Sequence, residues 1–463
     1  MENLFGRAKI VTDVDIIDRT NIEDVVKKVE QQFVTTIQEI DYLYDYYVGK
    51  QDILNRTKDI RSDICNMIVE NRAKEIVDFK TGYLCNNPIQ FISRGNDASE
   101  GETASQSVAK LNDFMLSEGK ASKDKALIDW MNIAGIGFRM VFPDELADPD
   151  VETDEAPFEL YTLDPRNAGI IRSNGITNKP LAGFYRVVRK IDDEQKTIYT
   201  VYTPDSVYTL YGSELQSVEA NGLGMIPIIE YQANIARMGA FEPVIPLLDA
   251  INTIDSNRLD GIEQFIQSLI LLINCELPEG ATAKTLFESG IVQIKDNGDG
   301  AKQDIKILAE QLDQQQTQTL KDDLYNSVLT ICAMPNRNGG SSTSDTGVAV
   351  IYRDGWNAAE ASAAAFELSF KESEIEMLKL VLYICSELSS LAMNPSKIDI
   401  KFTRRNYENI ETKSQVLNTM LGNPMIDPKL AFEYCNLFCD PEEAYQLSMS
   451  YYEKHKNDKV NEE

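Results

Sequence analysis

Histidine is almost absent from this sequence: the single one, His455, lies near the C-terminal end in a strongly polar segment. Most acid–base and nucleophile-activating sites in enzymes depend on histidine, so its scarcity argues against any histidine-dependent catalytic triad. We expect His455 to be a solvent-exposed surface residue.

Long apolar runs and a regular cysteine pattern are also missing. The most apolar stretch, FIQSLILLIN from Phe265, is about half the length that a transmembrane helix needs. Residues 1–20 mix charges with Val and Ile, unlike a secretory signal. The 7 cysteines are scattered and odd in number, as expected for free thiols in a reducing compartment. The sequence predicts a soluble protein without a membrane segment.

Positive charge is in short supply. The chain has 74 acidic and 45 basic residues, a formal net charge of −29. Such a surface repels phosphate backbones and anionic lipids, so strong nonspecific binding of nucleic acid or membrane is not expected. The same charge suits a surface that faces DNA without holding it.

The chain is long enough for about three domains, and its 43% hydrophobic content is sufficient for a sizeable core. Helical periodicity predicts helices over 25–49, 63–85 (with a stop at Gly82), 104–118 and 122–134. Between 138 and 232, short β-branched and aromatic runs alternate with turn residues, which predicts an antiparallel sheet. The expected fold class is α+β, mainly helical.

Three long helices are predicted in the second half of the chain. They cover about 243–273, 309–334 and 348–392. The insert 274–308 between the first two is predicted to hold a short helix, Thr282 to Ser289, and a hairpin of 290–295 with 303–308. A strand at 398–402 and helices near 411–421, 427–438 and 441–454 complete the prediction.

Two motifs that could bind metals have simpler interpretations. In DNGDG (296–300), Gly298 occupies a ligand position of the calcium-loop pattern, so a hairpin turn is favoured. Cys435 and Cys439 share one helical face, but a zinc site would need two more soft ligands, so core cysteines are favoured. No metal or cofactor is predicted.

The polar stretch NRNGGSSTSDTG (336–347) could be mistaken for a phosphate-binding loop. Such a loop follows a strand and ends in Gly-Lys-Ser/Thr, whereas this one follows a predicted helix, and no lysine lies between Met334 and Trp356. The basic cluster KFTRR (401–405) is typical of a solvated strand end. No enzymatic site is predicted.

Five stretches in a shared order carry a resemblance to a known family. They are YYVGKQDILNR (46–56), NRAKEIVDFKTGYLCNNPIQF (71–91), GIGFRMVFPDE (135–145), LDPRNAGIIRSN (163–174) and DTGVAVIYR (345–353). Together with the order of the elements, they resemble the portal proteins, or head-to-tail connectors, of tailed double-stranded DNA bacteriophages of the long-tailed siphovirus type. Where that family usually has Ser-Gly, this chain has Thr346-Gly347.

The resemblance implies a portal fold with named parts. These are a wing (1–239), a first stem helix (240–273), a clip (274–308), a second stem helix (309–335), a tunnel loop (336–347), a long wing helix (348–395) and a short crown (396–463). It also implies a virion protein, made in the bacterial cytoplasm, that forms a ring of usually twelve subunits at one capsid vertex. Double-stranded DNA would pass through the ring without sequence specificity.

The resemblance implies two sets of site residues. The tunnel loop contains Asn336, Arg337, Asn338, Gly339, Gly340, Ser341, Ser342, Thr343 and Ser344. Our hypothesis is that it lines the narrowest part of the channel, where Arg337 is the only cation and the Asn, Ser and Thr side chains make weak, sequence-blind contacts with DNA. The clip would dock the terminase large subunit and later the head–tail adaptor, through a region containing Thr282, Lys284, Glu288, Lys295, Asp296, Asn297 and Asp299. The major capsid and scaffolding proteins would be further partners.

Two other classes of protein remain as alternatives. A non-viral helical scaffolding or adaptor protein would use the long helices to bind partners and would form monomers or small oligomers. A carboxylate-dependent nuclease would need converging Asp and Glu pairs, and the sequence shows no such cluster.

Overall fold

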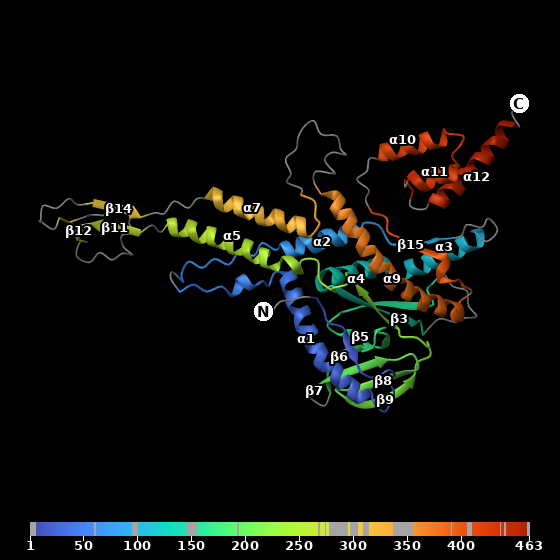
Figure 1. Ribbon diagram of the computed structural model, residues 1–463, viewed down its shortest axis with the longest axis horizontal. Helices are drawn as coiled ribbons and strands as arrows, with labels where there is room; N and C mark the ends of the chain where they lie inside the picture. The colour runs from blue at the N-terminus through green and yellow to red at the C-terminus, as the bar shows by residue number, and fades with distance from the viewer. Residues whose placement is uncertain are drawn as a thin grey trace. The chain divides into compact units, whose positions relative to one another are not determined.

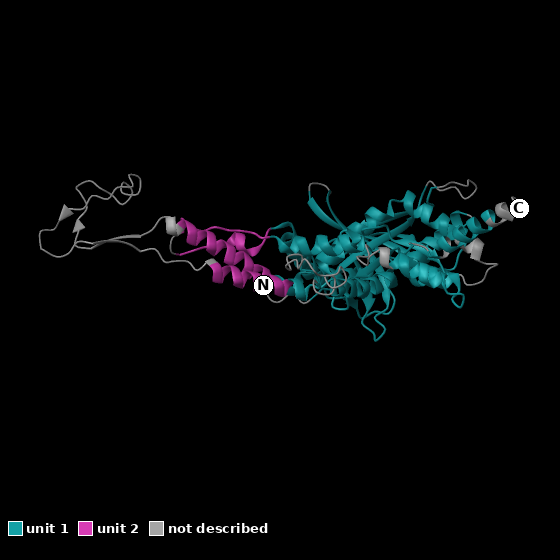
Figure 2. Ribbon diagram, turned by 90° about the horizontal axis from the view of Figure 1, so that it is seen from above, with its two compact units in different colours: residues 1–49, 71–245, 329–463 teal, residues 50–70, 246–328 magenta. Residues whose placement is uncertain are grey.

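The computed structural model combines helices and β-sheets, with a run of strands between residues 136 and 232 and long helices on either side of it in the sequence (Figure 1). The structure describes residues 6–59, 62–94, 101–145, 155–191, 194–266, 269–273, 275–276, 295–296, 304–308, 314–336, 355–389, 391–404, 410–435, 437–438 and 441–460. Contacts divide the chain into two units (Figure 2): unit 1 contains 1–49, 71–245 and 329–463, and unit 2 contains 50–70 and 246–328. The predicted α+β class is confirmed.

In unit 1, helix α1 (Ile22–Val48) packs on a six-stranded sheet. Its buried positions recur at helical spacing, and Phe33 meets Phe184 of the sheet edge-on at 5.0 Å between ring centroids. The helix ends at Gly49, whose φ of 99° permits the left-handed C-cap that the sequence predicts there.

The six strands lie in the order β1-β5-β6-β7-β8-β9. Their bounds are Ile10–Thr12, Ala168–Ser173, Pro180–Ile191, Glu194–Tyr202, Ser206–Tyr211 and Glu214–Ala220. The pairing is antiparallel except that β1 runs parallel to β5. The sequence does not reveal β1, which is only three residues long, or β9, whose exposed residues are mostly polar.

A second sheet has the order β10-β3-β4, so the expectation of one sheet is wrong. Its strands are Ile228–Gln232, Ile136–Pro143 and Phe158–Leu163. The core of this half of unit 1 also takes in α2 (Arg72–Leu84), α3 (Gly101–Ser117), α4 (Lys120–Ala134), α9 (Trp356–Leu388), and the pair β2 (Gln90–Ser93) with β15 (Ile398–Lys401).

Helix α9 is joined to this sheet by a buried network of charges. Arg139 of β3 donates to Asp124 of α4 at 2.6 Å and to Glu374 of α9 at 3.3 Å. Lys120 of α4 contacts the same two carboxylates, at 2.6 and 2.7 Å. The hydroxyl of Tyr231 of β10 donates to Glu374 at 2.6 Å. All five residues are buried, and the two cations balance the two carboxylates.

The network shifts the ionisation of its members. Burial by itself raises the pKa of Asp124, but Lys120 and Arg139 outweigh it and hold that pKa below the usual range. Burial and the charge of Glu374 raise the pKa of Tyr231. The Asp124 carboxylate is therefore ionised inside the fold because its cationic partners are fixed beside it.

The C-terminal part of unit 1 contains three further helices. These are α10 (Ile410–Leu421), α11 (Pro428–Cys435) and α12 (Pro441–Val460), which agree with the predicted helices to within a few residues. Short 3-10 turns, η2 (Glu242–Val244) and η3 (Pro395–Lys397), precede α5 and β15.

Unit 2 contains most of α5 (Ile245–Ile266) and α7 (Gln314–Ile331), together with residues 50–70, which include the turn η1 (Asp52–Asn55). Residues 63–71 are not helical, so the predicted helix 63–85 is wrong in its first third. Gly82 does not end α2 either, since the helix continues to Leu84 and tolerates the glycine at a modest cost.

The segment 66–70 lies along α5 in an extended form. Its alternate backbone N–H groups donate to α5 side chains one turn apart: Asn66 to Asp260, Ile68 to Ser256 and Glu70 to Asn252, at 2.8 to 2.9 Å. Two extended residues advance roughly 6.6 Å and four helical residues roughly 6 Å, so the two repeats match. These α5 side chains accept hydrogen bonds from backbone amides that would otherwise bond within a helix. Residues 66–70 therefore do not form a helix although their apolar residues have helical spacing.

This arrangement predicts that Ser256→Ala loosens residues 66–70. The Ser256 hydroxyl is buried, and its loss leaves the Ile68 N–H without an acceptor at a cost of about 1–3 kcal/mol. Hydrogen exchange at 66–70 is expected to accelerate. The matched control is Ser327→Ala on α7, where the exposed hydroxyl bonds only within its own helix, to the Asp323 carbonyl. Equal exchange rates in both variants would contradict the prediction.

The predicted first long helix and the insert need correction. The helix ends at Ile266, and Leu269–Ile273 is strand β11, paired with β14 (Asp304–Leu308). The pairing of β14 with β11 was not predicted, and residues 290–294 of the predicted hairpin lie outside the described residues. The run LILLI satisfies either a buried helix or a strand, and length alone could not decide between them.

Candidate functional site

The polar loop predicted to touch DNA lies almost wholly outside the described residues. Only Asn336 is described; Arg337, Asn338, Gly339, Gly340, Ser341, Ser342, Thr343 and Ser344 are not. The residues on either side are described, and they lie together. A Cβ atom added to Gly355 would lie 3.7 Å from the carbonyl oxygen of Met334 and 3.8 Å from Cα of Pro335, so the two segments are close together. The chain thus leaves this place at 336 and returns to it at 355.

The first side of this base is the end of α7. Ala333 has φ of 52°, and the Met334 N–H donates to the Leu329 carbonyl at 2.8 Å, the bond of a left-handed helix end. Met334 and Cys332 are buried, and the Cys332 thiol lies 3.6 Å from the carbonyl oxygen of Ala240. The departing chain is therefore fixed by its own backbone and by two buried side chains.

The second side is the start of α9, which rests on aromatic side chains of α2. Gly355, with φ of 84°, precedes Trp356 at the first helical position. The Trp356 ring lies 6.1 Å from Phe79 and 6.2 Å from Tyr83, centroid to centroid, and those two rings stack at 5.8 Å. Aromatic contacts of this kind add stability beyond the area they bury. They fix the point at which the chain returns.

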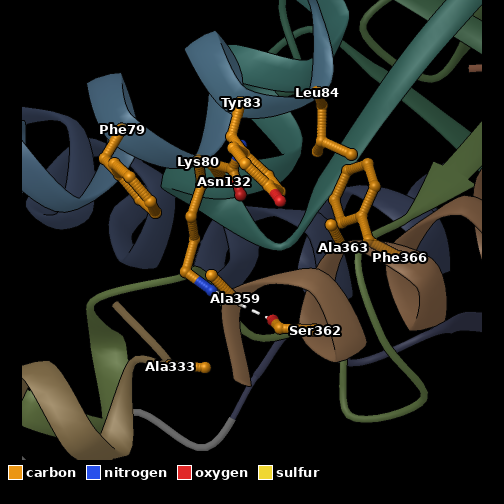
Figure 3. Close-up of a pocket in the computed structure, with 10 residues that line it drawn as sticks. All are labelled: Phe79, Lys80, Tyr83, Leu84, Asn132, Ala333, Ala359, Ser362, Ala363 and Phe366. Atoms are coloured by element: carbon orange, nitrogen blue, oxygen red, sulfur yellow. Dashed lines mark hydrogen bonds between the residues drawn. The ribbon is translucent and has the colours of Figure 1, made fainter. Parts of the chain in front are cut away.

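A small cavity of about 40 Å³ lies between α2, the end of α7 and α9 (Figure 3). It is large enough for roughly one or two water molecules. The side chain of Lys80 reaches across it and donates to the Ser362 hydroxyl at 3.3 Å. Burial lowers the pKa of Lys80, and among the described residues it forms no ion pair with a carboxylate. Lys80 is a positive charge held beside the base of the loop.

Further bonds brace the start of α9. The Tyr83 hydroxyl donates to Glu360 at 2.7 Å. Arg404 pairs with both Glu360 and Glu367. Burial raises the pKa of Glu367, and the nearby Arg404 charge partly offsets this. The first turns of α9 are thus bound on one side to α2 and on the other to the segment after β15.

The predicted clip residues are only partly described. Lys295 and Asp296 form strand β13, paired with β12 (Cys275–Glu276). Thr282, Lys284, Glu288, Asn297 and Asp299 lie outside the described residues. The structure therefore gives no geometry for the proposed docking surface beyond this two-residue pairing.

Chemistry-bearing groups are dispersed in the part of the chain that the structure describes. No cluster of three or more His, Cys, Asp or Glu side chains there is arranged to hold a metal ion. His455 is exposed, as predicted, and Cys435 is buried with a free thiol, whereas Cys439 lies outside the described residues. Within the same described residues, no helix combines the length and apolar character needed to cross a membrane.

The residues that build the base were not singled out from the sequence. Phe79, Lys80 and Tyr83 lie inside the stretch 71–91 that carries the family resemblance. Their spacing predicts a helix and does not indicate a site. The contacts of Trp356 and Ser362 with residues of α2 become visible only once the structure places α9 against α2. The sequence feature that could have indicated this base is a polar stretch followed closely by tryptophan, a residue that occurs only twice in the chain.

Long helices, two sheets and a fixed pair of chain positions at 334 and 355 characterise the described part of the chain. The model of the family described as phage portal protein, SPP1 Gp6-like, matches residues 26–456, and the chain belongs to this family. Its members are structural capsid connectors of bacteriophages with a role in genome packaging. No curated protein matches the chain.

Proposed function

We propose that this chain forms a ring at one vertex of a phage capsid and that double-stranded DNA passes through the centre of the ring during packaging and ejection. The observation that carries the proposal is the family match over residues 26–456. The net charge of −29 supports it, because a wall that repels phosphates adds little friction to moving DNA.

In this proposal the regions 1–239 and 348–395 form the wing, and 240–273 with 309–335 form the stem. Region 274–308 is the clip, 336–347 the tunnel loop and 396–463 a short crown. Two features of the structure support the stem: α5 and α7 both belong to unit 2, and the pairing of β11 with β14 brings the chain back after the insert.

The proposed clip receives the terminase large subunit during packaging and the head–tail adaptor afterwards. The residues proposed for this contact are Thr282, Lys284, Glu288, Lys295, Asp296, Asn297 and Asp299. The capsid vertex supplies contacts with the major capsid protein and, during assembly in the host cytoplasm, with the scaffolding protein.

The proposed tunnel loop contacts DNA through Arg337 and its small polar neighbours. The described base supports this role, because its two ends are fixed side by side by Met334 and Trp356. A loop held at such a base can yield at its tip while its position in the subunit stays constant.

The mass and shape of the purified protein test the proposal. We expect native mass spectrometry and negative-stain electron microscopy to show a ring of about twelve subunits with a central hole, the symmetric closed assembly that heterologous contacts generate. A non-viral scaffolding or adaptor protein would instead give a monomer or small oligomer without a hole. That outcome would contradict the portal function.

A further inference from the structure

The three C-terminal helices α10, α11 and α12 bury very little of their apolar surface. Among the residues of this segment whose side chains the structure describes (413–435, 437–438, 441 and 444–455), the buried ones are Ala431, Phe432 and Cys435, all on α11. Phe432 stacks on Phe438 at 5.3 Å and meets Tyr445 of α12 at 5.8 Å. This is a very small core for three helices, since even a domain of about 60 residues is only marginally stable.

Large apolar and aromatic side chains on α11 and α12 point to solvent instead. On α11, Leu430 and Tyr434 are 49% and 82% exposed; on α12, Leu447 and Tyr451 are 63% and 64% exposed. Each pair is four residues apart and so occupies one face of its helix. Both helices therefore have one face packed around Phe432 and another apolar face that is uncovered. We call the four residues the C-terminal stripe.

A second apolar patch lies on α10 and the turn after it. Val416 and Leu421 are 42% and 44% exposed, and Met425 is 90% exposed. Together with the C-terminal stripe, these side chains expose on the order of 800 Å² if each has the usual area of its type, which is about half of the total that the two partners of a standard interface bury. Scattered single exposed residues are normal in a monomer, but two such patches on one small segment mark an interaction surface.

We infer that the C-terminal stripe of one subunit packs against the patch at Val416, Leu421 and Met425 on a second copy of this chain. The three helices then acquire their full apolar core only in the assembled ring. The inference rests on the proposed ring. A closed ring needs two different surfaces on each subunit, one for each neighbour, and this segment has two exposed apolar patches on different helices.

A second copy fits this surface better than DNA does. Residues 410–460 contain 8 acidic and 5 basic residues, whereas a nucleic-acid surface needs an excess of Lys or Arg to meet phosphates. The family match extends through this segment to residue 456, so the segment is part of the region that this chain shares with the family. Cyclic symmetry places the same segment of every subunit at one height and one radius in the ring.

The test is the double variant Tyr434→Ser with Leu447→Ser in the full-length chain. Both side chains are exposed in the subunit, so the main thermal transition should stay within the small range of surface substitutions. We expect the concentration needed for ring formation to rise at least about tenfold, because central apolar anchors dominate an interface. Limited proteolysis should then cut within 410–460.

The matched control is Ile176→Ser with Ile235→Ser, two fully exposed apolar residues in loops elsewhere in unit 1. It should assemble like the wild type. Rings of the stripe variant at wild-type concentration would overturn this inference and leave the portal function standing. Absence of rings in the wild-type protein would overturn both.

Discussion

Replacing Lys120 by Met is expected to destabilise the protein by about 3–5 kcal/mol, because it leaves an uncompensated carboxylate in the buried network. Lys120 contacts Asp124 and Glu374 at 2.6 and 2.7 Å, and its ammonium group lies 5.3 Å from the centroid of the Phe91 ring. Methionine fills similar space without the charge. The melting temperature should fall by on the order of 10 °C in calorimetry or circular dichroism.

The same helix supplies the control. Lys125 and Asp129 form an ion pair at 2.8 Å with the same four-residue spacing, but the Lys125 side chain is 62% exposed. Exposed pairs of this kind contribute about 0.5 kcal/mol or less, so Lys125→Met should melt close to the wild type. An equal fall in melting temperature in both variants would contradict the prediction that burial makes the Lys120 network the larger contributor to stability.

Acid pH gives an independent check on the cause of the loss. The pKa of Asp124 is lowered in the folded protein, so its ionised contacts stabilise the fold above the ordinary pKa and are lost as pH falls through the lowered one. The difference between wild type and Lys120→Met should therefore shrink below about pH 4. A difference independent of pH would point to lost packing rather than lost charge.

These two lysines also show what sequence alone can predict. Lys120-Asp124 and Lys125-Asp129 are the same pattern, and nothing local tells which pair is buried; that depends on Arg139 and Glu374, brought in from β3 and α9. By contrast, α1 and its Gly49 end, and strand β3, follow from local periodicity and turn chemistry, and they were predicted correctly.

The failures of prediction have one physical origin, competition from distant partners. Residues 66–70 have a helical pattern but bond to α5, and LILLI has the composition of a buried helix but pairs with β14. At the candidate site, the polar character of 336–347 and the absence of a lysine were readable from the sequence. The aromatic support for Trp356 was not, because α2 precedes it by more than 270 residues.

Deleting residues 338–344 is expected to leave ring assembly intact and to yield mostly heads that lack a full genome. The removed residues are small and polar, so they contribute no apolar core. The described ends of the loop, at Met334 and Gly355, already lie side by side, so a shorter connection can close between them with little change in chain entropy. Electron microscopy of heads and nuclease-protected DNA would measure the outcome.

A control that keeps the length of the loop separates the effect of losing the loop itself from the effect of losing its hydroxyl side chains. If weak, sequence-blind contacts are what the loop provides, replacing Ser341, Ser342, Thr343 and Ser344 by glycine should package far better than the deletion, because backbone amides can still meet phosphates. Normal genome-filled heads from the deletion would refute the tunnel-loop proposal. Loss of rings in the deletion would instead mean that these residues stabilise the subunit or its contacts. That result would conflict with a base in which Met334 and Trp356 are fixed by their own neighbours.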